Sequence, residues 1–134
     1  MTTKKIVFAV NSYLQASQTI KSCKIYNIDP ILYIKYFIIN GFSPSWVEEL
    51  NNLLVNIFGK KKFEFCIDCR NNYSLFIDLA QKKIKYLKIK TNKKNYKKLK
   101  EIADKNKVLL NPRFSIVDLC KIKNIEKRIS KIKN

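Results

Sequence analysis

Short apolar runs alternate with longer amphipathic segments along the chain, and this alternation predicts strands and helices in turn. The apolar runs are rich in β-branched and aromatic residues, as is typical of buried strands, and cover 5–10, 31–38, 63–68, 84–89 and 108–110. Between and after these runs, apolar residues recur at helical spacing and predict helices over 13–26, 44–57, 72–80, 92–104 and 122–132. The stretch 114–120 fits either a helical turn or an extended segment.

Residues that favour helix ends and turns support these boundaries. Ser43 and Pro44 fit the N-cap and the first position of the second helix, and Gly59 fits the residue just past its end. Further caps and chain breaks are expected at Asn71 or Asn72, at Asn92, at Asp29–Pro30 and at Asn40–Gly41.

Five strand–helix units in succession indicate a single α/β domain over residues 1–134. Strand–helix–strand connections are right-handed and build a mostly parallel sheet, which helices cover on both faces. We therefore expect a three-layer domain with a five-stranded sheet in the flavodoxin-like or receiver-like order 2-1-3-4-5.

The composition adds a strong positive charge, formally +18 from 28 basic and 10 acidic residues. Only Arg70, Arg113 and Arg128 are arginines, although sites that read nucleic-acid bases favour arginine. Lysine, asparagine and isoleucine have AT-rich codons, so codon bias is an alternative explanation of the charge. The charge is nevertheless uneven, because residues 1–59 hold 5 basic and 3 acidic residues and residues 60–134 hold 23 and 7.

Missing residue types exclude several chemistries. The chain has no histidine, which excludes Ser-His-Asp hydrolysis, Cys-His proteolysis and HExxH zinc sites. Its only glycines are Gly41 and Gly59, so neither a GxGxxG fingerprint nor a Walker A loop is present. We therefore expect no metal and no cofactor, and a binding protein rather than an enzyme.

The start of the chain shows no signal peptide, and no apolar stretch approaches the ~20 residues of a membrane span. A cytoplasmic protein without membrane contact is expected, with its four cysteines reduced. Cys66 and Cys69 form a CxxC pair, but Cys66 lies inside a predicted strand rather than at a helix N-terminus, where redox thiols are activated. Cys23, Cys66 and Cys120 are therefore interpreted as small buried hydrophobic side chains.

The first candidate site lies at the carboxyl ends of the strands, where open α/β sheets bind ligands. The turn after the third strand is the most polar of these segments and contains Asp68, Cys69, Arg70, Asn71 and Asn72. Backbone N–H groups at the start of the next helix would hold an anion, with Arg70 assisting. Ser43 and Ser45, in the turn after the second strand, are expected to belong to the same ligand-binding site. The alternative is that Asp68 accepts local backbone hydrogen bonds and the asparagines only cap the helix.

The second candidate site is the lysine-rich part of the chain, residues 93–133. In the order 2-1-3-4-5 the fourth and the last helix follow adjacent strands, so their charges would merge into one basic edge. Such an edge would bind the phosphate backbone of RNA, DNA or the ribosome in a salt-dependent way, through Lys93, Lys94, Lys97, Lys98, Lys127 and Arg128. The alternative is a solvated lysine face without a partner.

The order of elements resembles that of response-regulator receiver domains, with Asp68 at the place of their phosphate-accepting aspartate. The acidic pair of that family is replaced by Val10-Asn11-Ser12, and its lysine after the fifth strand by Asn111. Without a carboxylate cluster no Mg²⁺ site forms. This resemblance therefore implies a degenerate receiver-like domain for protein interaction.

Two motifs carry a second resemblance: Phe42-Ser43-Pro44-Ser45-Trp46 and Cys66-Ile67-Asp68-Cys69, each followed by a predicted helix. Over roughly residues 31–110 the chain is similar to small uncharacterised α/β proteins of α-proteobacteria, which carry Gly-Pro-Gly-Trp-like and Asp-Cys-Gly-Asp-like turns. Serines replace the glycines of the first turn here, and Arg70-Asn71 replaces Gly-Asp in the second. The family has no known activity, so the resemblance implies only that Asp68–Cys69 belongs to a site.

Overall fold

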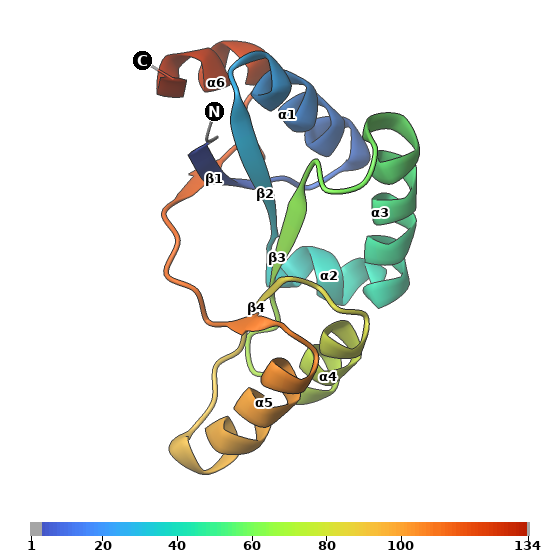
Figure 1. Ribbon diagram of the computed structural model, residues 1–134, viewed down its shortest axis with the longest axis vertical. Helices are drawn as coiled ribbons and strands as arrows, with labels where there is room; N and C mark the ends of the chain where they lie inside the picture. The colour runs from blue at the N-terminus through green and yellow to red at the C-terminus, as the bar shows by residue number, and fades with distance from the viewer. Residues whose placement is uncertain (1–3, 134) are drawn as a thin grey trace.

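Strands and helices alternate in the computed structural model, which describes residues 4–133 (Figure 1). The strands are β1 (Lys4–Ala9), β2 (Ile28–Ile34), β3 (Glu64–Asp68), β4 (Tyr86–Lys88), β5 (Leu109–Leu110) and β6 (Ile116–Asp118). The helices are α1 (Tyr13–Ile25), α2 (Tyr36–Phe42), α3 (Pro44–Phe58), α4 (Tyr73–Gln81), α5 (Lys93–Lys105) and α6 (Ile125–Lys133). The predicted α/β class is confirmed, with a six-stranded sheet where five strands were expected.

All five strand pairings are parallel, and the sheet has the order β5-β4-β3-β2-β1-β6. The expected order 2-1-3-4-5 is wrong, because β1 lies between β2 and β6 rather than between β2 and β3. From β1 to β5 each new strand is added beside the previous one. The hydrophobic pattern indicates which segments are strands, but it does not indicate on which side of the sheet the next strand is added.

This strand order places the helices on one face of the sheet. Right-handed crossovers that all step in the same direction bring their helices to the same side. Strand residues Leu32, Phe65 and Leu87 form one buried cluster there with Leu54 of α3 and Phe76 of α4. The helix α6 packs beside α1 in an adjoining cluster at the β1–β6 edge.

The expectation that helices cover both faces is wrong, because the other face of the sheet is covered by a short connection. Residues 111–115, which we call the crossing segment, run from β5 at one edge of the sheet to β6 at the other (Figure 1). Phe114 packs there against the cluster that includes Tyr33 and Cys66, and its ring meets that of Tyr86 edge-on at 5.1 Å. The domain thus has three layers, of which the third is the crossing segment.

Two predictions around the second strand are wrong. Asp29–Pro30 lies inside β2 instead of preceding it, and Pro30 is tolerated because β2 pairs with β3 only from Ile31 onward. The apolar run after Ile34 becomes α2, which contains Asn40–Gly41 in its last turn. A short apolar run does not by itself distinguish a strand from a buried helix, and here the second half of the run is helical.

Candidate functional site

The turn after β3 lies at the carboxyl edge of the sheet, and its polar atoms are engaged within the protein. Asp68 Oδ1 accepts a hydrogen bond from the Arg70 backbone N–H at 2.9 Å, and Oδ2 accepts one from the Tyr33 hydroxyl at 3.3 Å. Asn72 Oδ1 accepts a hydrogen bond from the Leu75 N–H at 3.0 Å and caps α4. These contacts correspond to the alternative in which the turn serves its own conformation and the helix cap.

The remaining residues of this turn differ in their access to solvent. Arg70 and Asn71 are exposed, and the Arg70 guanidinium lies 5.0 Å from the ring centroid of Tyr36. The Arg70 carbonyl oxygen accepts a hydrogen bond from the Lys90 N–H at 2.6 Å. Cys69 is fully buried, and burial raises the pKa of its thiol to about 12. Arg70 is therefore the one charged group of this turn that an external anion can reach.

The CxxC pair is split between the two faces of the sheet. Cys66 packs under the crossing segment, whereas Cys69 packs among the helices. Burial raises the pKa of the Cys66 thiol to about 12 as well. Both thiols are therefore protonated at neutral pH, and the two sulfur atoms do not share one site.

Ser43 and Ser45 lie at the junction of α2 and α3, and their hydroxyl oxygens are 2.9 Å apart. Ser43 has φ +77°, and its side chain makes no capping hydrogen bond to α3, contrary to the expected N-cap contact. Within residues 4–133 no hydrogen bond joins either serine to residues 68–72. The two turns are thus not linked into one polar site.

The two lysine-rich helices do not form one surface. α5 follows β4, near the β5 edge of the sheet, and α6 follows β6 at the opposite edge, as Figure 1 shows. The expected merged basic edge is wrong, because it depended on the strand order 2-1-3-4-5. Exposed cations remain on each helix separately: Lys93, Lys94, Lys97 and Lys98 on α5, and Lys127 and Arg128 on α6.

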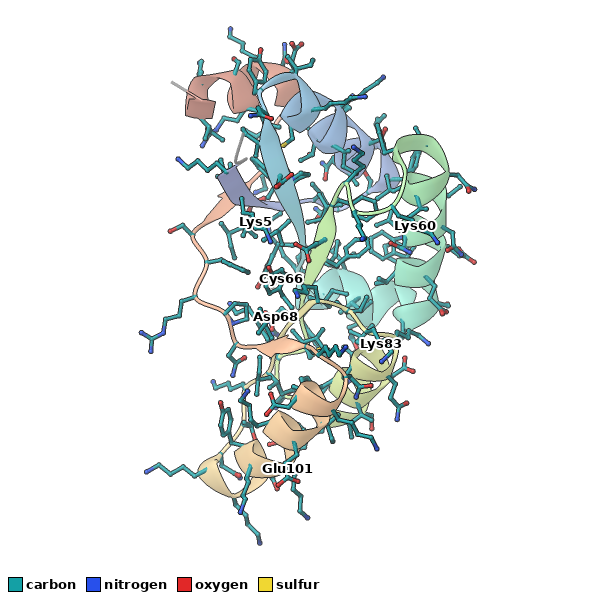
Figure 2. All side chains as sticks on the ribbon, in the orientation of Figure 1. Lys5, Lys60, Cys66, Asp68, Lys83 and Glu101 are labelled. Carbon is teal, nitrogen blue, oxygen red and sulfur yellow. The ribbon has the colours of Figure 1, made fainter. Side chains whose placement is uncertain are left out.

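A larger group of lysines gathers at the amino edge of the sheet. Helix-to-strand connections of a parallel sheet all return to the edge where the strands begin. Lysine occurs in each of these connections or at the end of the helix before it, and two more lysines begin β1. The full set is Lys4, Lys5, Lys24, Lys60, Lys61, Lys62, Lys82, Lys83, Lys85, Lys105 and Lys107. We call these the amino-end lysines; Figure 2 labels Lys5, Lys60 and Lys83, which come from three different segments. This group was not predicted from the sequence, because lysines were assigned to helices and not to the connections between helix and strand.

A cavity of about 570 Å³ opens at this edge, between the starts of β2, β3 and β4. Six amino-end lysines line it: Lys5, Lys61, Lys62, Lys82, Lys83 and Lys85. The rest of the wall is formed by two carboxylates, one amide and four apolar side chains: Asp29, Glu64, Asn51, Pro30, Phe63, Phe65 and Ile84. We call this cavity the basic pocket.

Ion pairs with other described residues engage two of the six pocket lysines. Lys5 Nζ lies 3.3 Å from Glu64 Oε1, and this hydrogen bond raises the pKa of Lys5. Lys82 Nζ lies 3.8 Å from Glu48 and 3.5 Å from Asp78. The other four are exposed and make no ion pair with any described residue: Lys61, Lys62, Lys83 and Lys85. The basic pocket therefore carries an excess of positive charge that favours anions.

Three amino-end lysines occupy left-handed backbone conformations: Lys61 with φ +64°, Lys83 with φ +62° and Lys107 with φ +59°. Lys83 follows the end of α4 in a Schellman motif, in which the Ile84 N–H donates to the Leu79 carbonyl oxygen at 3.3 Å. Glycine is the usual residue at such a position, and a residue with a Cβ costs roughly 1–2 kcal/mol there. The chain thus places lysine at this edge where the backbone favours glycine.

A separate polar network joins the carboxyl ends of β1, β2 and β6. Lys35 Nζ lies 2.7 Å from Asp118 Oδ2, and the Cys120 N–H donates to Asp118 Oδ1 at 2.9 Å. The hydrogen bond from Lys35 lowers the pKa of Asp118 to about 2. The Cys120 thiol donates to Asn11 at 2.9 Å, and burial raises its pKa to about 11, so it is not a thiolate at neutral pH. This network connects the end of the short strand β6 to residues just past the ends of β1 and β2.

Comparison of the chain with protein-family models, with curated proteins and with solved structures finds no match. In the described part of the chain, no group of three or more cysteine, aspartate or glutamate side chains is placed to hold a metal ion. No helix within residues 4–133 has both the length and the hydropathy needed to cross a membrane. The resemblance to the α-proteobacterial family stays a prediction, and function is inferred below from geometry and charge.

Proposed function

We propose that this protein is an anion-binding α/β domain that takes phosphate-bearing ligands in the basic pocket. The observation that carries the proposal is the presence, around one cavity of about 570 Å³, of four lysines that make no ion pair with a described residue. We call these four the unpaired lysines. Ligand sites in proteins have volumes of roughly 300–1,000 Å³. Phosphate groups would relieve the repulsion among these ammonium groups, which a neutral ligand would not do.

The turn at residues 68–72 is a weaker candidate for the same function. Both carboxylate oxygens of Asp68 already accept hydrogen bonds, and Asn72 is used as a helix cap. Residues 68–72 line neither the basic pocket nor three other hollows on the described part of the chain. Arg70, the one cation of this turn, does not line the basic pocket.

The lining of the basic pocket supports binding rather than catalysis. Serine, threonine and cysteine are missing from its described lining, and Glu64 is held in the ion pair with Lys5. Hydroxyl and thiol nucleophiles are therefore missing from the described wall.

Titration calorimetry with inorganic polyphosphate tests the proposal. The triple variant Lys62→Glu, Lys83→Glu, Lys85→Glu should bind polyphosphate at least about tenfold more weakly than the unmodified protein, since three attractive contacts become repulsive. The matched control Lys93→Glu, Lys97→Glu, Lys98→Glu carries the same charge change on α5 and should bind within about threefold of the unmodified protein.

Two outcomes would contradict the proposal. Equal losses in both variants would show that polyphosphate responds only to net charge. A loss confined to the α5 variant would place the site on the exposed lysines of α5 instead. An Asp68→Ala, Arg70→Ala variant, measured beside them, reports on the turn after β3 and should bind as the unmodified protein does.

A further inference from the structure

The basic pocket is the middle of three hollows along the amino edge of the sheet. A hollow of about 250 Å³ toward α1 shares Pro30 and Lys62 with it, and a hollow of about 220 Å³ toward α3 and α4 shares Asn51 and Lys82. The three hollows are adjacent, because each neighbouring pair shares wall residues, and together we call them the amino-edge trough. An elongated ligand fits this shape better than a single small anion does.

Cations without an ion pair to any described residue lie in two of the three hollows. Lys24 lines the hollow toward α1, and Lys61, Lys62, Lys83 and Lys85 surround the basic pocket. In the hollow toward α4, Lys82 is paired with Glu48 and Asp78. Lys60 lies exposed in the same connection as Lys61. Successive phosphates of a chain would thus meet successive ammonium groups.

An aromatic ring stands among these cations. Phe63, the residue before β3, is partly exposed and lines the basic pocket. Its ring meets the buried Phe65 ring edge-on at a centroid distance of 5.5 Å and an angle of 82°, and it packs against the main core cluster. The ring is therefore held in place at the wall of the pocket, next to Lys61 and Lys62.

We infer that the ligand of the amino-edge trough is a single-stranded nucleic acid, which lays its phosphates on the amino-end lysines and stacks one base on Phe63. This inference rests on the proposed function and names its substrate class. A cationic groove with an aromatic stacking surface is the combination by which proteins bind single strands without sequence preference. The scarcity of arginine agrees with sequence-neutral binding.

A double helix does not satisfy the same site. Its bases are stacked on each other and present only their edges in the grooves, so Phe63 has no base face to contact. Inorganic polyphosphate would reach the lysines of the trough but has no base. Comparing a single strand, a duplex and polyphosphate therefore separates the contribution of charge from that of stacking.

Fluorescence anisotropy with a labelled 12-nucleotide oligothymidylate, a 12-base-pair duplex and polyphosphate as competitor tests the inference. Phe63→Leu should lower the affinity for the single strand about tenfold, the loss expected for one stacked base. Affinity for polyphosphate should be unchanged in this variant, and Phe63→Tyr should restore single-strand binding. The unmodified protein should prefer the single strand to the duplex by about tenfold at equal salt.

The inference is overturned if Phe63→Leu binds the single strand as the unmodified protein does, or if duplex and single strand bind equally well. Polyphosphate binding that depends on Lys62, Lys83 and Lys85 would then leave the proposed function intact, whereas its absence would defeat both. Should Phe63→Leu fail to fold, ultraviolet cross-linking of a 5-iodouracil oligonucleotide to the unmodified protein decides. An adduct on the peptide that contains Phe63 supports the inference, and an adduct only on α5 or α6 refutes it.

Discussion

Neutralising the four unpaired lysines of the basic pocket should weaken the salt dependence of single-strand binding by a calculable amount. For single strands, log K falls with log salt concentration with a slope of about −0.7 per phosphate that the protein neutralises. If each of the four lysines contacts one phosphate, their replacement by glutamine reduces the slope by about 2.8 units. Between 50 and 200 mM salt, the loss of affinity should then be about 50-fold smaller than in the unmodified protein.

The assay is anisotropy of a labelled oligothymidylate at five or more salt concentrations. A matched control removes the same charge by replacing four exposed lysines of the C-terminal segment by glutamine: Lys121, Lys123, Lys127 and Lys131. This control should change the slope by less than about one unit, as should the variant of Lys93, Lys94, Lys97 and Lys98. An unchanged slope in the pocket variant, or equal reductions in all three variants, would refute the assignment of phosphates to the basic pocket.

Three further substitutions test other parts of the account. Lys83→Gly should raise the free energy of unfolding by about 1 kcal/mol, because glycine adopts the left-handed conformation without strain, while it weakens polyphosphate binding; urea denaturation that shows no gain contradicts the strain argument. Lys35 lowers the folded pKa of Asp118 to about 2, so the stability that this ion pair contributes is complete above the unfolded pKa near 3.8 and is lost as the pH falls toward 2. Asp118→Asn should remove this pH-dependent part of the free energy of unfolding. That contribution should be at most about 1 kcal/mol for this exposed pair, and a variant whose denaturation midpoints keep the wild-type pH dependence between pH 4 and pH 2 would disprove it. Phe114→Ala should cost about 2 kcal/mol and speed the reaction of Cys66 with a thiol reagent, because the crossing segment loses its anchor; unchanged labelling would show that something else covers this face.

The local structure of this chain is largely readable from its sequence. Asn92 caps its helix as predicted, and of the two predicted candidates Asn71 and Asn72 it is Asn72 that caps α4. Each cap accepts a hydrogen bond from the N–H three residues on. Gly59 ends α3 at φ +93°, a conformation that favours glycine. These features depend on neighbouring residues only, and therefore propensities and caps predict them.

The strand order depends on contacts between distant segments and was not predictable in the same way. The expected order 2-1-3-4-5 requires the connection between the second and third strands to pass over β1, and no residue of 35–63 indicates whether it does. The sixth strand, Ile116–Asp118, pairs with β1. Because it has three residues, its hydrophobic pattern is too short to distinguish a strand from a helical turn.

The proposed site differs from the predicted one for the same reason. Asp68 and its neighbours were singled out because polar residues after a strand are visible in the sequence, yet such residues also serve turns and caps. The amino-end lysines are spread over more than a hundred residues and come together only at the edge of a parallel sheet. Assigning every lysine to its helix-to-strand connection would have revealed them, because each such connection has lysine in it or beside it.

The central claim, that phosphates occupy the basic pocket, is tested most directly by lysine acetylation footprinting. The protein is treated briefly with an acetylating reagent, with and without saturating oligothymidylate or polyphosphate, and the modified lysines are quantified by mass spectrometry. We predict protection of Lys61, Lys62, Lys83 and Lys85 by both ligands, with Lys97 and Lys127 modified at unchanged rates. Protection of the α5 or α6 lysines with no change in the four pocket lysines would contradict the account.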